Sequence, residues 1–408
     1  MFTPSFFQSN RQRLLAELPA GSLVVLAAHD VMQSKGDDGF PFVQEPNFWY
    51  LSGIESAGAV IVCSQQTSYI IAPRRSAVEI IFDGAVEAAD LQKVSGVDAV
   101  YTATEGWHQL KPAVTQASYV YTLLPQKANT LATHIHQNPG PIRLAKQLKR
   151  WGNQELQDAR PALESLRVRK QAPELRALQQ AIDITAEGLA QCAQEAKTRT
   201  HEHELLALLS SQYQMQGAEH GYQPVVASGT HATVVHYREN RAPLPEQGMV
   251  LIDSGAAVQG YSADISRTYS CGAVTERQAA VYEAVVTAHQ AILAELKLGM
   301  TLIDLERVAC RVIAEQLQLL GLLKDPEDTK TLRRYYPHAI SHFLGLEVHD
   351  VGDYHMPLEA DMVFTVEPGI YIPEEAIGVR VEDNIVMTKK GFENLSAHIP
   401  IAKRTELG

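Results

Sequence analysis

The sequence predicts an α/β domain over residues 1–160 and an α+β domain over residues 173–408, joined by a linker over residues 161–172. In the first half, short apolar runs alternate with helix-like stretches, which is typical of an α/β domain. The second half combines helix start signals with two strand-turn-strand segments that carry acidic residues. This combination favours helices on one side and a sheet that lines a site on the other.

Three apolar runs in the first half are predicted strands, at residues 22–28, 58–63 and 68–72. The predicted linker contains a basic run over residues 166–170, and runs of this kind usually form the solvated face of a helix. A helix is expected to begin at Pro173, because proline is favoured in the first helical turn.

Helices are also expected to begin near Thr200, Thr275 and Thr301, since a threonine hydroxyl can cap the free N–H groups of a first turn. The stretch from Thr275 to Gln278 has the order of a capping box. Gly299 is a suitable residue to stop the helix that begins at Thr275.

Two aspartates flank the first predicted hairpin. Asp253 ends an apolar run that begins at Met249, and Asp264 begins a second strand-like run, with Gly255 and Gly260 between them. The midpoint of the two aspartates falls beside Gly260. Folding about that turn is expected to place them roughly opposite each other on paired strands.

Two glutamates repeat this arrangement further along the chain. Glu367 lies in the strand-like segment 362–373, and Glu382 lies in segment 378–386. Their midpoint falls in the polar stretch at residues 374–375. A second hairpin is therefore predicted, again with one acid on each arm.

Four carboxylates brought together would repel one another, and burying them as ions without compensating charge costs several kcal/mol each. For any one of these acids alone, a solvated strand edge or a turn is the common situation. Both pairs straddle turns, however, and segment 335–350 holds three histidines, His338, His342 and His349. The sequence therefore predicts bound divalent cations. With one imidazole and otherwise oxygen ligands, Mn²⁺ fits best, with Co²⁺ or Zn²⁺ as alternatives.

The composition excludes several classes of partner. The formal net charge of -12 argues against nucleic acid and anionic membranes, since both need basic patches. No apolar run reaches membrane-spanning length, and the first residues lack the basic-then-apolar order of a signal peptide. The four cysteines show no CxxC spacing, so free thiols are expected. We therefore expect a cytoplasmic protein.

Together with segment 227–237, which contains His236, these motifs resemble the creatinase/aminopeptidase family, which has the pita-bread fold. The resemblance runs from about residue 172 to the end of the chain and fills all five expected ligand positions. It implies two divalent metals, with the following assignment of ligands: Asp253 mainly on one metal, His342 and Glu367 on the other, and Asp264 and Glu382 bridging both.

The resemblance also implies roles in peptide hydrolysis. Glu367 would accept the proton of the attacking water, while His236 and His349 would orient the substrate carbonyl and stabilise the tetrahedral intermediate. His338 would lie behind the ligands. Arg380, two residues before Glu382 and so on the same strand face, could hold a ligand carboxylate.

Within the family, the stretch 342–350 resembles the proline-peptidase branch. The aromatic-rich segment 40–53 is similar to the N-terminal domain of the aminopeptidase P group, although a core strand with aromatic packing is the alternative for it. The expected substrates are therefore peptides with proline in the second position. Family members are commonly dimers or tetramers in which one N-terminal domain shields a neighbour's site, so a homodimer or homotetramer is implied.

Other functions stay open on the sequence. Many relatives carry an arginine between the equivalents of His349 and Glu367, but residues 350–366 hold no arginine, and their only basic residue is His355. Without that cation, tripeptides should be preferred over dipeptides, unless Arg380 or His355 supplies the charge. The alternatives are a prolidase, a non-catalytic peptide-binding module and creatinase-type C–N hydrolysis.

Overall fold

The computed structural model describes residues 2–126, 136–152 and 154–402. The chain divides into two compact units, Met1–Leu166 and Arg167–Gly408. Helix α7 (Arg160–Arg167) covers part of the segment predicted as a linker, and α8 (Ala172–Glu195) follows it. The bounds of the two domains as given by the sequence stay a prediction.

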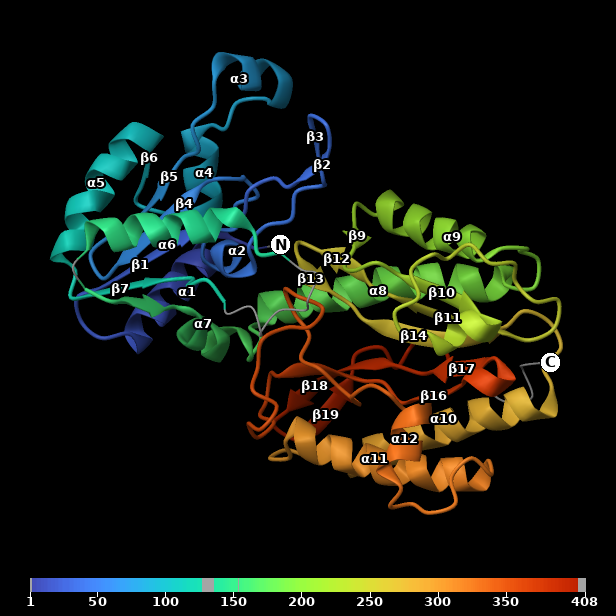
Figure 1. The fold of residues 1–408 in the computed structure, drawn as a ribbon. Coiled ribbons are helices and arrows are strands. Elements are labelled where there is room, and N and C mark those ends of the chain that lie inside the picture. Colours follow the sequence, from blue (N-terminus) through green and yellow to red (C-terminus); the bar gives the residue numbers. More distant parts are fainter. Residues whose placement is uncertain (1, 127–135, 153, 403–408) are drawn as a thin grey trace. The chain divides into compact units, whose positions relative to one another are not determined.

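The first unit is built on a six-stranded mixed sheet with strand order β6-β5-β4-β1-β7-β8 (Figure 1). The central strand β1 pairs antiparallel with β4 and parallel with β7. The three strands predicted from apolar runs are confirmed as β1, β4 and β5. The six strands are β1 (Ser22–Ala27), β4 (Val60–Ser64), β5 (Ser68–Ile71), β6 (Ala99–Tyr101), β7 (Tyr119–Thr122) and β8 (Leu156–Asp158).

Helices pack on this sheet, and a small hairpin extends from it. Residues 46–52 of the aromatic-rich segment form helix α2, so the alternative of a core strand is wrong, although its aromatic packing is found: α2 buries Phe48, Trp49 and Tyr50, and the Glu45 carboxylate caps its first turn. The remaining elements are α1 (Pro4–Glu17), β2 (Gln33–Lys35), β3 (Asp38–Gly39), α2 (Pro46–Ser52), α3 (Ala77–Asp83), α4 (Ala88–Ser95), α5 (Ala103–Gln116) and α6 (Pro139–Trp151).

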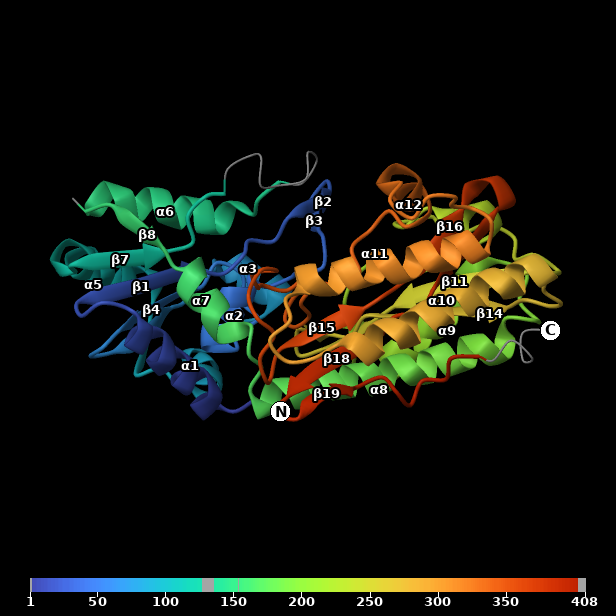
Figure 2. The same cartoon turned by 90° about the horizontal axis from the view of Figure 1, so that it is seen from below.

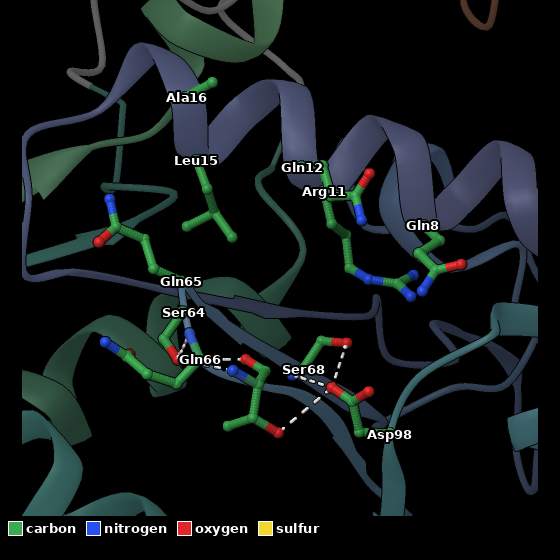
Figure 3. Close-up of a pocket in the computed structure, with 11 residues that line it drawn as sticks. Gln8, Arg11, Gln12, Leu15, Ala16, Ser64, Gln65, Gln66, Ser68 and Asp98 are labelled. Atoms are coloured by element: carbon green, nitrogen blue, oxygen red, sulfur yellow. Dashed lines mark hydrogen bonds between the residues drawn. The ribbon is translucent and has the colours of Figure 1, made fainter.

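A cavity of about 400 Å³ lies beside α1 and the turn between β4 and β5 (Figure 3). Its two charged groups are engaged by the protein itself. The Arg11 guanidinium donates to the carbonyl oxygens of Leu51 and Ser95, and the Asp98 carboxylate accepts from the backbone N–H of Ser68. These groups therefore serve the packing of the first unit.

Antiparallel strands form the sheets of the second unit. The first hairpin lies in a sheet of order β10-β11-β14, and the second is divided between a sheet of order β15-β18-β19 and the pair β16-β17. The strands are β9 (Glu219–His220), β10 (Val225–Ser228), β11 (Met249–Ser254), β12 (Ala256–Val258), β13 (Tyr261–Ser262), β14 (Ile265–Ser270), β15 (Val363–Val366), β16 (Gly369–Ile372), β17 (Ile377–Arg380), β18 (Asp383–Thr388) and β19 (Gly391–Asn394).

Two helix pairs cover these sheets, and the strands lie between the pairs (Figures 1 and 2). Helices α8 and α9 (Glu202–Met215) share an apolar core with β10, β11 and β14, whereas α10 (Glu276–Glu295) and α11 (Leu302–Leu319) share one with β15 to β18. Each half of the unit thus combines a helix pair with an acid-bearing hairpin. The remaining helical segments are α12 (Thr329–Tyr335), η2 (Gly229–Thr233) and η3 (Pro373–Glu375).

The predicted helix starts are confirmed, and the start of α9 is displaced by one residue. Pro173 lies in the first turn of α8, Thr275 closes a capping box at α10, and Thr301 caps α11. The N-cap of α9 is His201 instead of Thr200. The predicted helix stop at Gly299 is also displaced, because α10 ends at Glu295 with Leu296 as its C-cap. No helix among the described residues has the length and apolar content needed to cross a membrane.

The prediction that the basic run at residues 166–170 is a solvated helix face is wrong. The Arg167 and Lys170 side chains are each 1% exposed, and both form ion pairs with the equally buried Asp350, at 2.5 and 3.0 Å. Only Arg169, which lies between them, is largely solvated. The acid that pairs with the run lies far along the chain, so the local pattern carried no sign of it. Burial of these charges is possible because they are paired.

Candidate metal centre

The first hairpin places two aspartates on one face of its sheet. Strand β11 pairs with β14 so that Asp253 lies opposite Ser266, and Asp264 directly precedes β14. The loop at the tip is Gln259 and Gly260, both with positive φ, as a two-residue hairpin turn requires. The predicted hairpin is confirmed, but its register is displaced by one residue on each arm. Asp264 therefore lies diagonal to Asp253 instead of opposite it.

The second hairpin is interrupted where its acids lie. Val366 pairs with Asp383 on one side of the break and Gly369 pairs with Arg380 on the other, so one register runs through both sheets. That register sets Glu367 opposite Glu382, as the sequence predicted. At the break, the backbone N–H of Glu382 donates to the carbonyl of Ser266 at 3.1 Å. This bond joins the second hairpin to the first.

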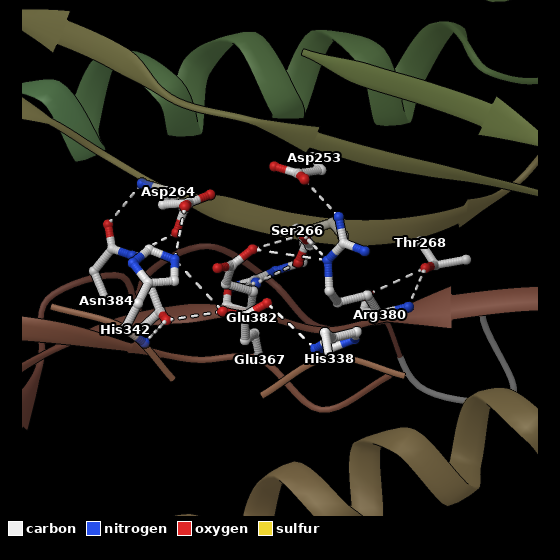
Figure 4. Close-up of polar contacts among 12 residues, drawn as sticks. Asp253, Asp264, Ser266, Thr268, His338, His342, Glu367, Arg380, Glu382 and Asn384 are labelled. Atoms are coloured by element: carbon white, nitrogen blue, oxygen red, sulfur yellow. Dashed lines mark hydrogen bonds and ion pairs between the residues drawn. The ribbon is translucent and has the colours of Figure 1, made fainter. Parts of the chain in front are cut away.

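Three ligand-type side chains converge at this junction (Figure 4). Asp264, His342 and Glu382 each offer one ligand atom, and these atoms lie within 4.8 Å of one another. His342 Nε2 lies 3.3 Å from Asp264 Oδ2 and 3.5 Å from Glu367 Oε1. The Nδ1 atom of the same ring lies 3.0 Å from the carbonyl oxygen of Phe343, to which it can only donate. This bond fixes the tautomer that leaves Nε2 free to bind a cation.

Asp253 is held by two side chains beside this cluster. The Tyr222 hydroxyl lies 2.6 Å from an oxygen of Asp253 and 2.6 Å from an oxygen of Asp264. Tyr222 was not predicted: it lies in the link between β9 and β10, where no motif marks it. Its single O–H can donate to only one of the two carboxylates at a time, so Tyr222 cannot satisfy both acids at once.

Arg380 is almost fully buried behind Asp253. Its guanidinium donates to Asp253, to the Ser266 hydroxyl at 2.6 Å and to the Tyr371 hydroxyl at 2.8 Å. The Ser266 hydroxyl in turn donates to Glu382 at 2.7 Å. The partner of Arg380 is therefore a protein carboxylate, and a role in holding a substrate carboxylate stays a prediction.

The pKa values of the acids show that the protein supplies too little positive charge. Burial, together with the charge of Asp264, raises the pKa of Glu367 to about 7, and burial raises the pKa of Asp253 to about 6 despite Arg380. Burial and the neighbouring acids raise the pKa of Glu382 well above its usual value. Cations would relieve this deficit, and clustered carboxylates with one imidazole are suitable ligands for Mn²⁺, Co²⁺ or Zn²⁺. The residues present thus fit divalent metals.

A cavity of about 270 Å³ opens onto the acids. Asp253, Asp264, Glu367, Glu382 and His342 all contribute to its lining. His236 and His349 also line it and are exposed, and the His349 ring stands edge-on to the His342 ring at 4.4 Å. These two histidines face the space that a substrate would enter.

His338 lies on the far side of Glu367. Its Nε2 is 2.8 Å from the Tyr371 hydroxyl, and its Nδ1 is 3.7 Å from Glu367 Oε2. Burial lowers the pKa of His338 to about 3, so the ring is neutral at physiological pH. This placement agrees with a supporting position behind the ligands.

Two known families match this chain. Residues 176–389 match the metallopeptidase family M24, and residues 7–121 match the N-terminal domain of aminopeptidase P. The Xaa-Pro aminopeptidase of Haemophilus influenzae is 30% identical to the chain, with 97% of the chain and 94% of the relative covered.

Solved structures agree with these matches. The proline aminopeptidase P II of Yersinia pestis is 28% identical, with a TM-score of 0.89 over 99% of this chain and 98% of that one. A zinc-substituted aminopeptidase P of Escherichia coli in complex with product is also 28% identical, with a TM-score of 0.88 over 100% and 97% of the two chains. The similarity extends across both units of the chain.

Proposed function

The chain belongs to the metallopeptidase family M24, and on this premise we propose that it is an aminopeptidase that releases the N-terminal residue from peptides with proline in the second position. The observation that carries the proposal is the junction of the two hairpins, where four acids and His342 meet at one cavity. The aminopeptidase P N-terminal domain and the similarity to Xaa-Pro aminopeptidases along the whole chain support the same activity. A non-catalytic peptide-binding module would not need this set of metal ligands.

We propose that the site holds two divalent ions, with Mn²⁺ as the native metal. Asp253, Asp264, His342, Glu367 and Glu382 are the proposed ligands, and the excess of carboxylate oxygen over imidazole nitrogen favours a hard ion. Bound ions would lower the pKa of a water molecule and polarise the scissile carbonyl.

Three side chains are proposed to act on the reactants. Glu367 lines the cavity and has a pKa raised to about 7, so it is suited to accept the proton of an attacking water near neutral pH. His236 and His349 face the cavity and can donate hydrogen bonds to the oxygen that gains charge during attack.

Proline in the second position suits the walls of this cavity. Val225, Val235 and Val348 give it apolar walls that can contact an imino ring. The ring also removes the amide N–H of the residue, so no unsatisfied donor enters the site. A side chain of the same size with free rotation would lose more entropy on binding.

The proposal is tested with metal-stripped protein to which Mn²⁺, Co²⁺ or Zn²⁺ is restored. The substrates are a tripeptide Xaa-Pro-Yaa, the dipeptide Xaa-Pro and a tripeptide with alanine in place of proline. We expect release of Xaa from the proline tripeptide with the highest kcat/KM. Equal or faster cleavage of the dipeptide would establish a prolidase instead, and tight binding without cleavage under any metal would establish a binding module.

We further propose that copies of the chain associate. Helix α3 buries none of its residues and exposes Val78, Ile81 and Phe82 at 62%, 79% and 81%. An apolar cluster of this kind on a small helix is typical of an interface. Sedimentation velocity should show a dimer or tetramer, and the variant Phe82→Glu should shift it towards the monomer.

All four cysteines are free thiols in the structure. This agrees with the expectation from their spacing, and on it we propose a cytoplasmic location, since a reducing compartment keeps thiols free. Cell fractionation with detection of the protein by antibody tests the location.

A further inference from the structure

Two arginines line the cavity of the metal centre, and they differ in whether the guanidinium has hydrogen-bond partners within the protein. Arg380 is buried and donates to three protein groups. Arg238 is exposed at the same cavity. Among the described residues, its guanidinium makes no hydrogen bond or ion pair, so this cation is available to a ligand.

The backbone at Arg238 is held in place although the side chain is free. Its carbonyl oxygen accepts hydrogen bonds from the side-chain amides of Gln223 at 3.2 Å and of Asn240 at 3.4 Å. Asn240 is buried, and its side chain also bonds the Pro224 carbonyl at 2.9 Å and the Val226 N–H at 2.8 Å. These bonds fix the loop to strand β10, so the backbone from which the Arg238 side chain reaches the cavity lining is held in place.

The charge of the cavity limits where a peptide carboxylate can bind. Besides the histidines, the other ionisable acids and cations of the lining are the four acids and Arg380, whose guanidinium already donates to three protein groups. His355, the basic residue of the stretch 350–366, is exposed and does not belong to the described lining of the cavity. A carboxylate that enters the cavity therefore has one unoccupied arginine to meet, Arg238.

We propose that Arg238 binds the C-terminal carboxylate of short peptide substrates; this inference rests on the proposed aminopeptidase function. A guanidinium suits the task because its parallel N–H groups match the two oxygens of a carboxylate. The cavity volume of about 270 Å³ lies at the small end of ligand sites, so a short peptide reaches its edge. Longer peptides, whose carboxylate lies outside, gain nothing from this contact.

The test compares peptide acids with the corresponding amides. The substrates are Xaa-Pro-Yaa, Xaa-Pro-Yaa amide and the dipeptide Xaa-Pro, and the enzymes are the wild type, Arg238→Gln, Arg238→Lys and the control Arg241→Gln. Arg241 is an exposed arginine of the same loop that is not among the residues described around the cavity. Binding of the product dipeptide Pro-Yaa and of its amide is measured by calorimetry as a second readout.

For the wild type we expect the acid to have a KM about tenfold lower than the amide, with similar kcat, because a charge-assisted bond acts on binding. Arg238→Gln should raise the KM of the acid to that of the amide without changing kcat, and Arg238→Lys should restore part of the difference. The same pattern should appear in the affinity for Pro-Yaa. High salt should reduce the difference in KM between the acid and the amide in the wild type, since salt screens an exposed charge. Whether the effect is larger for the tripeptide or the dipeptide acid identifies which carboxylate is bound.

Two results would overturn the inference, and they differ from failure of the proposed function. If the wild type cleaves the acid and the amide with equal KM, no carboxylate is recognised. If Arg238→Gln and Arg241→Gln reduce the acid-to-amide ratio equally, the effect is general charge attraction and not a contact. Absence of cleavage of all three substrates by the wild type would instead refute the aminopeptidase activity, and with it this inference.

Discussion

In protein from which the metals have been removed, the free energy of unfolding should fall as the pH rises from 7 to 9. The residue responsible is His342, whose side chain is 10% exposed. Burial acts to lower the pKa of His342, but the hydrogen bond with Asp264 and the charge of Glu367 outweigh it and raise the pKa to about 9. The folded protein therefore keeps a proton that the unfolded chain has released, and this contribution to stability is lost as the pH rises.

The size of the effect follows from the shift. The pKa moves from 6.5 in the unfolded chain to about 9 in the folded protein. At about 1.36 kcal/mol per pKa unit, integration from pH 7 to pH 9 gives a loss of about 2 kcal/mol. For a unit of this size, that is a fall of roughly 4 to 8 °C in Tm. Glu382, whose pKa is also raised by burial and by its acidic neighbours, acts in the same direction.

Thermal unfolding of chelator-treated protein at pH 7, 8 and 9 measures this loss, with metal-restored protein and metal-free His342→Gln as controls. A bound metal requires a neutral imidazole, so the metal-restored protein should lose the dependence that His342 causes. Comparison with His342→Gln cancels the contribution of titrating groups that do not interact with His342, such as the buried thiols, and isolates His342 together with the acids coupled to it. If the metal-free wild type and His342→Gln show the same pH dependence, the proton on His342 does not stabilise the fold and the electrostatic account of the site is wrong.

Three further predictions concern single residues. Asp264→Asn should lose turnover and, by elemental analysis, bound metal, because in its proposed bridging position the Asp264 carboxylate would offset the charge of both cations; two metals and a normal rate in this variant would exclude Asp264 from the site. His236→Ala and His349→Ala should keep their metal but lower kcat by about 10²-fold, the scale of one lost transition-state donor; metal loss would make these residues ligands. Asp350→Ala should destabilise the second unit by about 3 to 5 kcal/mol in urea unfolding, since Arg167 and Lys170 lose the buried carboxylate that they share. Glu359→Ala, which breaks an exposed pair, should cost about 1 kcal/mol or less, and equal losses for the two would contradict this view of the buried cluster.

Local patterns in the sequence determined both hairpins and most helix starts. Alternating apolar runs, turn residues and capping residues act over a few neighbours, so they can be recognised without knowledge of the fold. The position of Glu367 opposite Glu382 followed from symmetry about a turn, and the structure confirms it. The same argument placed the turn of the first hairpin one residue too early. The turn formed at Gln259 and Gly260, so Asp264 lies diagonal to Asp253 and not opposite it.

Only the tertiary structure decided which distant groups meet. Tyr222 contacts two acids of the site, and Asp350 forms ion pairs with a basic run whose pattern suggested a solvated surface. Arg238 lines the cavity without a protein partner among the described residues, whereas the guanidinium of Arg380 is bound by Asp253. No motif indicates these contacts, because each contact joins positions far apart in the sequence. Their pairing is set by burial: a charge removed from water must find an opposite charge or a hydrogen bond wherever the fold provides one. The sequence fixes which charges exist, and packing determines which of them remain open to a ligand.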